Sequence, residues 1–130
     1  MTLEAWYRDL VVRRSSTLPH SVQVEGLRRK HLGPRSEYAR VVFEAVPADE
    51  FAVSGPAVPL SDECLDLLRS AIFGFLDVVL TAGRGPLRNV ALRVVEVDCH
   101  PIDSSSMAFR EAGRDAGRKL LQEIGLEGTS

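Results

Sequence analysis

The sequence has no long hydrophobic run. Its longest apolar stretch, residues 71–80, is short and contains Asp77, whereas a membrane-spanning helix needs about 20 apolar residues. The N-terminal residues carry Glu4, Arg8 and Asp9 among their apolar side chains, which interrupts the apolar core that a signal peptide requires. We therefore expect neither a transmembrane segment nor a secretion signal.

Cysteine is also scarce, with Cys64 and Cys99 as its two occurrences. So few cysteines without a signal peptide indicate a cytoplasmic protein with reduced thiols, each thiol acting as a small buried apolar group. Together with His20, His31 and His100 they lack the paired spacing that structural zinc sites use. We expect no metal and no cofactor.

Lysine occurs at two positions, Lys30 and Lys119, and each follows an arginine. The phosphate-binding loop of a GTPase or ATPase needs a glycine directly before its lysine, because the backbone there must approach the phosphates closely. The sequence therefore predicts no binding of nucleoside triphosphates.

The net charge is small, but it is unevenly distributed. The formal charge is −2 and the isoelectric point about 5.9. Residues 1–40 hold eight of the 16 Lys and Arg but four of the 18 Asp and Glu, a local balance of +4 that leaves −6 for the other residues. This asymmetry favours a polarised surface, although scattered solvated charges would give the same totals.

Three strands are predicted before the first helix. Residues 6–14, 21–29 and 38–46 are rich in β-branched and aromatic residues. Pro19 lies between the first two, which indicates that they form a hairpin. Several prolines and a glycine then predict irregular chain up to residue 60.

Two helices and one further strand follow. Ser61 is a good N-cap, and leucines at helical spacing predict a helix that ends before Gly83. Residues 87–98 predict a strand, and residues 104–124 a last helix capped by Asp103 or the serines after it. The order is β-β-β-α-β-α in a single domain, 1–130, with an α+β fold whose two helices cover one face of the sheet.

Small residues line the last predicted helix. Ala108, Ala112, Gly113, Ala116 and Gly117 lie at helical spacing. Glycine inside a helix costs about 0.5–1 kcal/mol relative to alanine, so two glycines indicate a packing reason. We expect this helix to lie close to the sheet or to the first helix.

The first predicted helix is apolar around most of its circumference over residues 71–80. One sheet contact would not bury all of it. Either the second helix covers the remainder, or it is a dimer or partner interface that contains Ile72, Phe73, Phe75 and Val79.

A histidine, an acid and serines cluster at His100, Asp103 and residues 104–106. A Ser-His-Asp hydrolase uses these residue types, but closeness in sequence says little about triad geometry. Helix capping by Asp103 and Ser104, with His100 in an exposed loop, is the favoured interpretation.

Several segments resemble domain IV of translation elongation factor G. Residues 100–113, HPIDSSSMAFREAG, resemble its His-x-Val-Asp-Ser-Ser-Glu-x-Ala-Phe-Lys-x-Ala signature. Residues 7–9, 24–26, 33–42 and 83–97 resemble further segments of that domain in the same order. The first loop departs from the pattern at Gly33-Pro34 and Arg35-Ser36, and the acid of the helix start is replaced by Ser106.

The resemblance implies a left-handed βαβ crossover and a domain tip that enters the ribosomal decoding centre. Carried over by position, the tip would present Arg35, Glu37, His100, Asp103, Ser104 and Ser105. A supporting basic patch would consist of Arg28, Arg29, Lys30 and His31.

Two functional hypotheses follow. The first is a non-enzymatic, translation-related module that binds the ribosome or structured RNA through this tip. The alternative is a protein-interaction or dimerisation module that has the same fold without ribosome binding.

Overall fold

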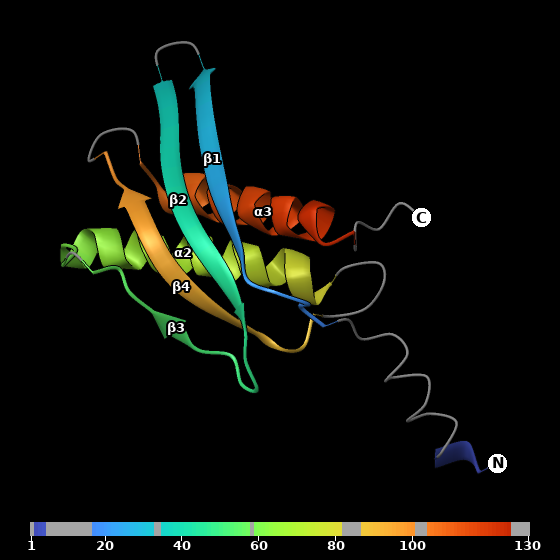
Figure 1. Ribbon diagram of the computed structural model, residues 1–130. Coiled ribbons are helices and arrows are strands. Elements are labelled where there is room, and N and C mark those ends of the chain that lie inside the picture. The colour runs from blue at the N-terminus through green and yellow to red at the C-terminus, as the bar shows by residue number, and fades with distance from the viewer. Residues whose placement is uncertain are drawn as a thin grey trace.

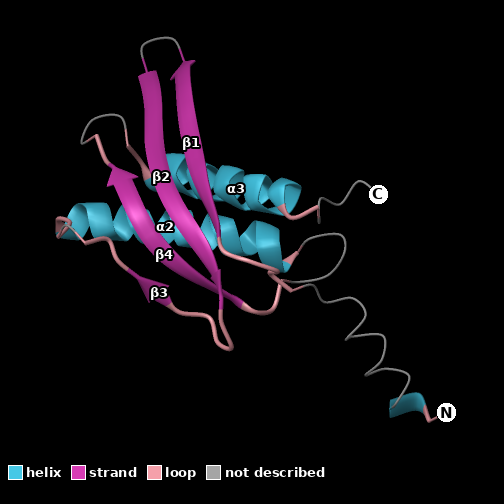
Figure 2. Cartoon of the chain, viewed as in Figure 1, coloured by secondary structure: helices cyan, strands magenta, loops and turns pink. Residues whose placement is uncertain are grey.

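The computed structural model describes residues 2–4, 17–32, 35–57, 59–81, 87–100 and 104–125. Its elements are four strands and two long helices (Figures 1 and 2). In chain order they are β1 (Val22–Leu32), β2 (Arg35–Pro47), β3 (Val53–Ser54), α2 (Asp62–Leu80), β4 (Val90–Asp98) and α3 (Ser106–Glu123).

The four strands form one sheet in the order β1-β2-β4-β3. β1 and β2 are a long antiparallel hairpin whose register runs from Val22↔Ala45 to Leu32↔Arg35. β2 also pairs antiparallel with β4, and this register shifts next to Phe43, because Phe43 pairs with Val94 while its neighbour pairs with Glu96. The outer end of the hairpin extends beyond the helices (Figure 1).

β3 pairs parallel with β4, and α2 connects them. Both helices lie behind the sheet in Figure 1, so the chain passes from β3 behind the sheet to β4 in a left-handed sense. This crossover agrees with the one that the resemblance implies. Most crossovers of this type are right-handed, so the handedness distinguishes this fold.

The core lies between the sheet and the helix layer. Alternate residues of β2 point toward the helices, as a strand with one buried face requires; they are Ala39, Val41, Phe43 and Ala45, all fully buried. Phe43 contacts Phe75 of α2 edge to face, with the ring centroids 5.7 Å apart. Phe109 of α3 is also fully buried.

Glycines allow α3 to approach both α2 and β1. A Cβ atom at Gly113 would lie 1.8 Å from the carbonyl oxygen of Ala71 in α2. A Cβ atom at Gly26 of β1 would lie 2.0 Å from the carbonyl oxygen of Ala112. No side chain fits at such distances, so the predicted packing reason for the small residues of α3 is confirmed.

The predicted element order and α+β class are confirmed, but the three early strands are not the three predicted ones. The first predicted strand, residues 6–14, lies outside the described residues. The second and third pair with each other as β1 and β2, and β3 lies within residues predicted to be irregular. A two-residue strand has no sequence pattern of its own, because its hydrogen bonds come from the parallel neighbour.

Candidate functional site

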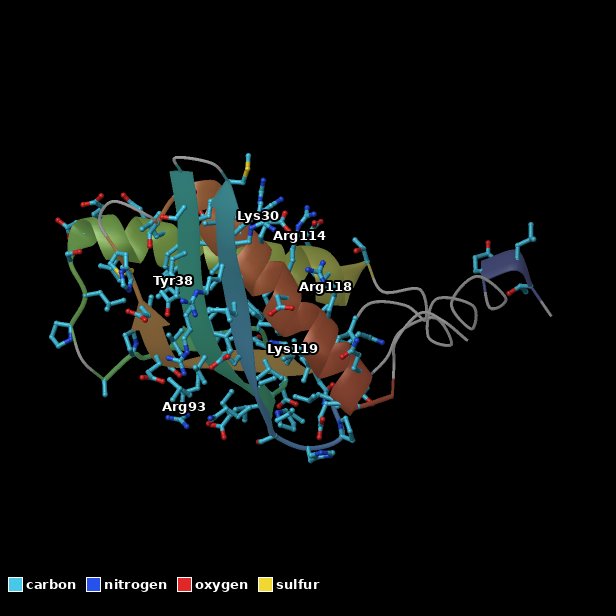
Figure 3. All side chains as sticks on the ribbon, turned by 90° about the horizontal axis from the view of Figure 1, so that it is seen from above. Lys30, Tyr38, Arg93, Arg114, Arg118 and Lys119 are labelled. Carbon is cyan, nitrogen blue, oxygen red and sulfur yellow. A yellow bond between two sulfur atoms is a disulfide. The ribbon has the colours of Figure 1, made fainter. Side chains whose placement is uncertain are left out.

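Two segments distant in sequence meet where the β1–β2 hairpin leaves the helix layer. Tyr38 comes from β2, and Asp98, His100 and Ser104 come from the end of β4 and the turn before α3. We call these four residues the tip cluster. Figure 3 labels Tyr38 within it.

Tyr38 contacts the other three members. Its hydroxyl donates to Asp98 Oδ2 at 2.7 Å, and its ring meets the His100 imidazole edge to face with centroids 4.5 Å apart. The hydrogen bond to Asp98 raises the pKa of Tyr38, because the carboxylate stabilises the protonated phenol; desolvation acts in the same direction.

Ser104 closes the turn after β4. Its hydroxyl donates to the carbonyl oxygen of Tyr38 at 2.8 Å and accepts the His100 backbone N–H at 2.8 Å. The Ser104 N–H in turn donates to the His100 carbonyl oxygen at 2.8 Å. Ser104 is therefore a structural link between β2 and the turn, whereas the N-cap of α3 is Ser105, whose hydroxyl accepts the Ala108 N–H.

The His100 imidazole faces a carboxylate and not the Ser104 hydroxyl. His100 Nε2 lies 3.5 Å from Asp98 Oδ1, while the Ser104 hydroxyl proton is directed to the Tyr38 carbonyl. A hydrolase serine needs a base in hydrogen-bonding contact with its hydroxyl. The Ser104 hydroxyl donates to a backbone carbonyl oxygen and has no such base as its acceptor.

The predicted basic patch is partly neutralised. Arg28 Nε lies 3.0 Å from Glu37 Oε2, so these two predicted site residues pair with each other. Arg29 and Lys30 are exposed and make no ion pair with any residue that the structure describes. Asp103 and the side chains of His31 and Arg35 lie outside what the structure describes.

The cysteines correct the prediction of reduced thiols. Cys64 in the first turn of α2 and Cys99 after β4 form a disulfide, with Cα atoms 6.2 Å apart. The predicted positions in helix and strand end were right, and Cys64 is buried. Pairing was missed because residues 35 apart in sequence reach bonding distance only through the tertiary fold.

A small pocket lies beside the disulfide. Its volume is about 120 Å3, and both cysteines, His100 and Ser104 line it together with Ser61 of the α2 cap. The pocket therefore opens between the start of α2 and the tip cluster.

The predicted interface on α2 needs correction. Phe75 and Val79 are fully buried, because α3 and the sheet cover that side of α2, and they cannot face a partner. Ile72 is partly buried against the core, whereas Phe73 is 63% exposed. Phe73 lines a groove of about 480 Å3 with Leu76, Asp77, Leu80, Thr81, Arg110 and Arg114.

The described parts of the chain offer neither a cluster of metal ligands nor a membrane span. They contain no group of three or more His, Cys, Asp or Glu side chains that could hold a metal ion. None of their helices is both long enough and apolar enough to cross a membrane.

Sequence reasoning missed Tyr38 and Asp98 as site residues. Tyr38 lies within one of the segments that resemble elongation factor G, but no pattern singled out its side chain. Asp98 is a polar residue at a strand end, next to Cys99 and His100. That adjacency is the signal that could have indicated it.

No protein-family model matches the chain. Among solved structures it is similar to a crystal structure of a protein from Thermus thermophilus, with a TM-score of 0.67 and 20% sequence identity. The match covers 82% of this chain and 16% of the Thermus protein. This similarity supports the fold, and the chain spans a small part of its neighbour's length.

Proposed function

We propose that this protein is a non-enzymatic module that binds structured RNA, as found in the ribosome, through the end of the β1–β2 hairpin and the tip cluster. One observation carries the proposal. The hairpin extends beyond the helix layer with two exposed cations, Arg29 and Lys30, and the His100–Ser104 turn is held against it through Tyr38. The resemblance to elongation factor G domain IV implies the same two segments at its ribosome-contacting tip.

Charge at the hairpin supports this choice of ligand. Lysine and arginine side chains that are not already paired neutralise backbone phosphates, and this releases the counterions condensed on the nucleic acid. Arg29 and Lys30 meet this condition, since Glu37 is already paired with Arg28. Lys30 points to the same side of the sheet as Arg114 and Arg118 (Figure 3), of which Arg114 is already paired with Asp77.

The tip cluster supplies groups that suit RNA contacts. The His100 side chain is half exposed, and an exposed imidazole is able to stack on a base. Ser104 hydrogen-bonds the His100 backbone at both its N–H and its carbonyl oxygen, and the Tyr38 ring packs against the imidazole. The cluster therefore presents an imidazole that its neighbours hold in place.

Sedimentation with purified ribosomes at several salt concentrations tests the proposal. We expect co-sedimentation that weakens as salt increases, because phosphate contacts release counterions. Lys30→Ala is expected to reduce the slope of log affinity against log salt by about one. Arg69→Ala is the control for loss of one positive charge away from the hairpin, because Arg69 lies on α2, is exposed and is paired with the equally exposed Asp66.

Two results would contradict the proposal. If the protein stays out of the ribosomal fractions even at low salt, RNA binding through the tip is wrong. If Arg69→Ala weakens binding as much as Lys30→Ala does, the binding is a general charge effect and not a property of the hairpin.

A second candidate is self-association through the groove on the helix layer. Phe73 and Leu80 line this groove and are 63% and 48% exposed, and apolar surface of this kind favours a protein partner. Light scattering over a range of concentrations tests it. We expect Phe73→Arg to abolish a dimer and Met107→Arg, an exposed site outside the groove, to leave it intact. A wild-type monomer at every concentration would exclude this candidate.

A further inference from the structure

The Cys64–Cys99 disulfide joins the helix layer to the tip cluster. Cys64 lies in the first turn of α2, and Cys99 lies between Asp98 and His100, two members of the cluster. The hydrogen bonds of Ser104, the ring contact with Tyr38 and the approach of Asp98 to the imidazole also hold His100. The disulfide is thus a covalent clamp at the proposed binding site.

We propose that this disulfide is a thiol–disulfide exchange site at which a dithiol reductant opens the clamp and so regulates the tip. The proposal rests on the proposed function for its biological consequence, but the exchange chemistry stands separately.

Access to the sulfur atoms supports the proposal. Disulfides that are reduced in the native state must be reached by the attacking thiolate. The pocket of about 120 Å3 is lined by both cysteines, and Cys99 is partly exposed whereas Cys64 is 7% exposed. Cys99 is therefore the more accessible of the two residues, and we assign the attack of an incoming thiolate to its sulfur.

The position of Cys64 favours it as the leaving group. Cys64 is the third residue of α2 after the Ser61 cap, and its backbone N–H is held by the Ser61 hydroxyl at 3.2 Å. The positive end of a helix dipole stabilises a thiolate in the first turn, and a more stable thiolate leaves faster. Asp62 and Glu63, which also lie in this turn, oppose part of that effect.

The exchange proceeds in two balanced steps. One thiolate of the dithiol attacks Cys99 Sγ, which forms a mixed disulfide and releases Cys64 as a thiolate that takes up a proton. The second thiol of the reductant then loses its proton, and its thiolate attacks the other sulfur of the reductant, which is bonded to Cys99 in the mixed disulfide. Cys99 leaves as a thiolate and is protonated, and the reductant departs oxidised by two electrons.

Opening the clamp changes the tip more than the core. The large buried side chains Phe43, Phe75 and Phe109 pack between the layers without the disulfide. Cys99, in contrast, would lose its covalent link to α2 and retain only noncovalent contacts, among them its packing against the edge of the core. In a reducing compartment such a disulfide is typically transient and regulatory.

The test begins with the fully oxidised chain in native buffer. Dithiothreitol is the probe, and intact mass after alkylation counts the free thiols while circular dichroism reports the fold. We expect the rate of thiol release to rise in proportion to dithiothreitol concentration, with native helical signal at the time of reduction. Amide hydrogen exchange is expected to accelerate at Cys99 and His100 and in the first turn of α3.

Two results would overturn the proposal. The first is a reduction rate that is independent of dithiothreitol and equal to the global unfolding rate, because the clamp would then open only on unfolding. The second is an air-oxidised protein with two alkylatable thiols. Neither result requires the reduced form to be stable.

A variant separates the effect of the bond from other effects of the reductant. Cys64→Ala/Cys99→Ala should show the fast exchange of the reduced protein with and without dithiothreitol. If its exchange equals that of the oxidised chain, the bond does not hold the tip and the regulatory part is wrong. Absence of ribosome binding in both oxidised and reduced protein would instead contradict the proposed function alone.

Discussion

Tyr38 is the residue through which the parts of the tip cluster are connected. Its hydroxyl, ring and carbonyl oxygen contact Asp98, His100 and Ser104 respectively. A phenol that donates to a carboxylate makes a charge-assisted hydrogen bond, which is stronger than a neutral one. Replacement by phenylalanine would retain the ring contact and remove this hydrogen bond.

The Asp98 contact makes a prediction for the ionisation of Tyr38. The folded-state pKa lies above the ordinary value of 10.0, so this contact stabilises the fold fully below pH 10. That stabilisation is lost as the pH rises through the higher folded-state pKa, where the phenolate would face Asp98. Phenolate absorbance of wild type minus Tyr38→Phe should therefore show a midpoint above 10.

Asp98→Asn is the control for this titration. It removes the carboxylate that is the main cause of the higher pKa, so the Tyr38 midpoint should move down toward the ordinary value. An unchanged midpoint in Asp98→Asn would show that Asp98 does not cause the shift. The signal can be resolved because the chain has two tyrosines, Tyr7 and Tyr38.

At the residue scale, the sequence predicted those roles in the site that depend on neighbouring residues in the chain. Ser105 was among the predicted caps because a serine before an amphipathic run caps a helix. The role of Ser104 could not be predicted, since its partner Tyr38 is 66 residues away in sequence. The Arg28–Glu37 pair was missed for a related reason, because the predicted hairpin did not place these two residues on adjacent strands.

At the element scale, the close contact between α2 and α3 depends on glycines, which have no side chain. Gly113 of α3 lies against the Ala71 backbone, and Gly117 lies against Val78 and Phe75. Close approach of this kind brings many atoms into contact. The sequence predicted the small residues and their packing role, but not which of the two glycines lies closer to the α2 backbone.

Substitution of these two glycines distinguishes their surroundings. Gly113→Ala would place Cβ 1.8 Å from the carbonyl oxygen of Ala71, and the helices would have to move apart. We expect it to destabilise the fold by about 2–3 kcal/mol, since overpacking outweighs the gain in helix propensity. The free energy of unfolding from urea titration measures the effect.

Gly117→Ala is the matched control within the same helix. Its Cβ would lie 3.0 Å from Val78 Cβ and 3.2 Å from the carbonyl oxygen of Phe75, so α2 and α3 would have to separate by only a few tenths of an ångström. The gain in helix propensity offsets much of this contact, so we expect a change within about 1 kcal/mol. Equal destabilisation by both substitutions would contradict the assigned helix–helix geometry.

At the scale of the whole molecule, the two faces of the sheet differ. One face is covered by α2 and α3, and the other carries ion pairs that cross strands, among them Arg40 with Glu25 and Glu96. Arg93, paired with Glu44, points away from the side of Arg114 and Arg118 (Figure 3). Exposed pairs of this kind contribute little stability, so the fold depends on its buried face and on the disulfide.

The disulfide therefore makes a prediction for global stability. It closes a loop between residues 35 apart in sequence, which reduces the entropy of the unfolded chain by an amount worth about 4 kcal/mol in the loop-closure model. Cys64→Ala/Cys99→Ala should lower the free energy of unfolding by up to that amount and lower Tm by about 10–15 °C. Reduced wild type should behave similarly, because both lack the same covalent link.

The control for this prediction uses the single variant Cys99→Ser with and without reductant. It cannot form the disulfide, so dithiothreitol should change its Tm little while it lowers that of the wild type. If oxidised wild type and the double variant unfold at the same urea concentration, the link does not stabilise the fold. The double variant could instead be less stable than oxidised wild type and yet have the same helical signal at low urea. That result would show that the core folds without the clamp, and reversible opening of the tip requires this condition.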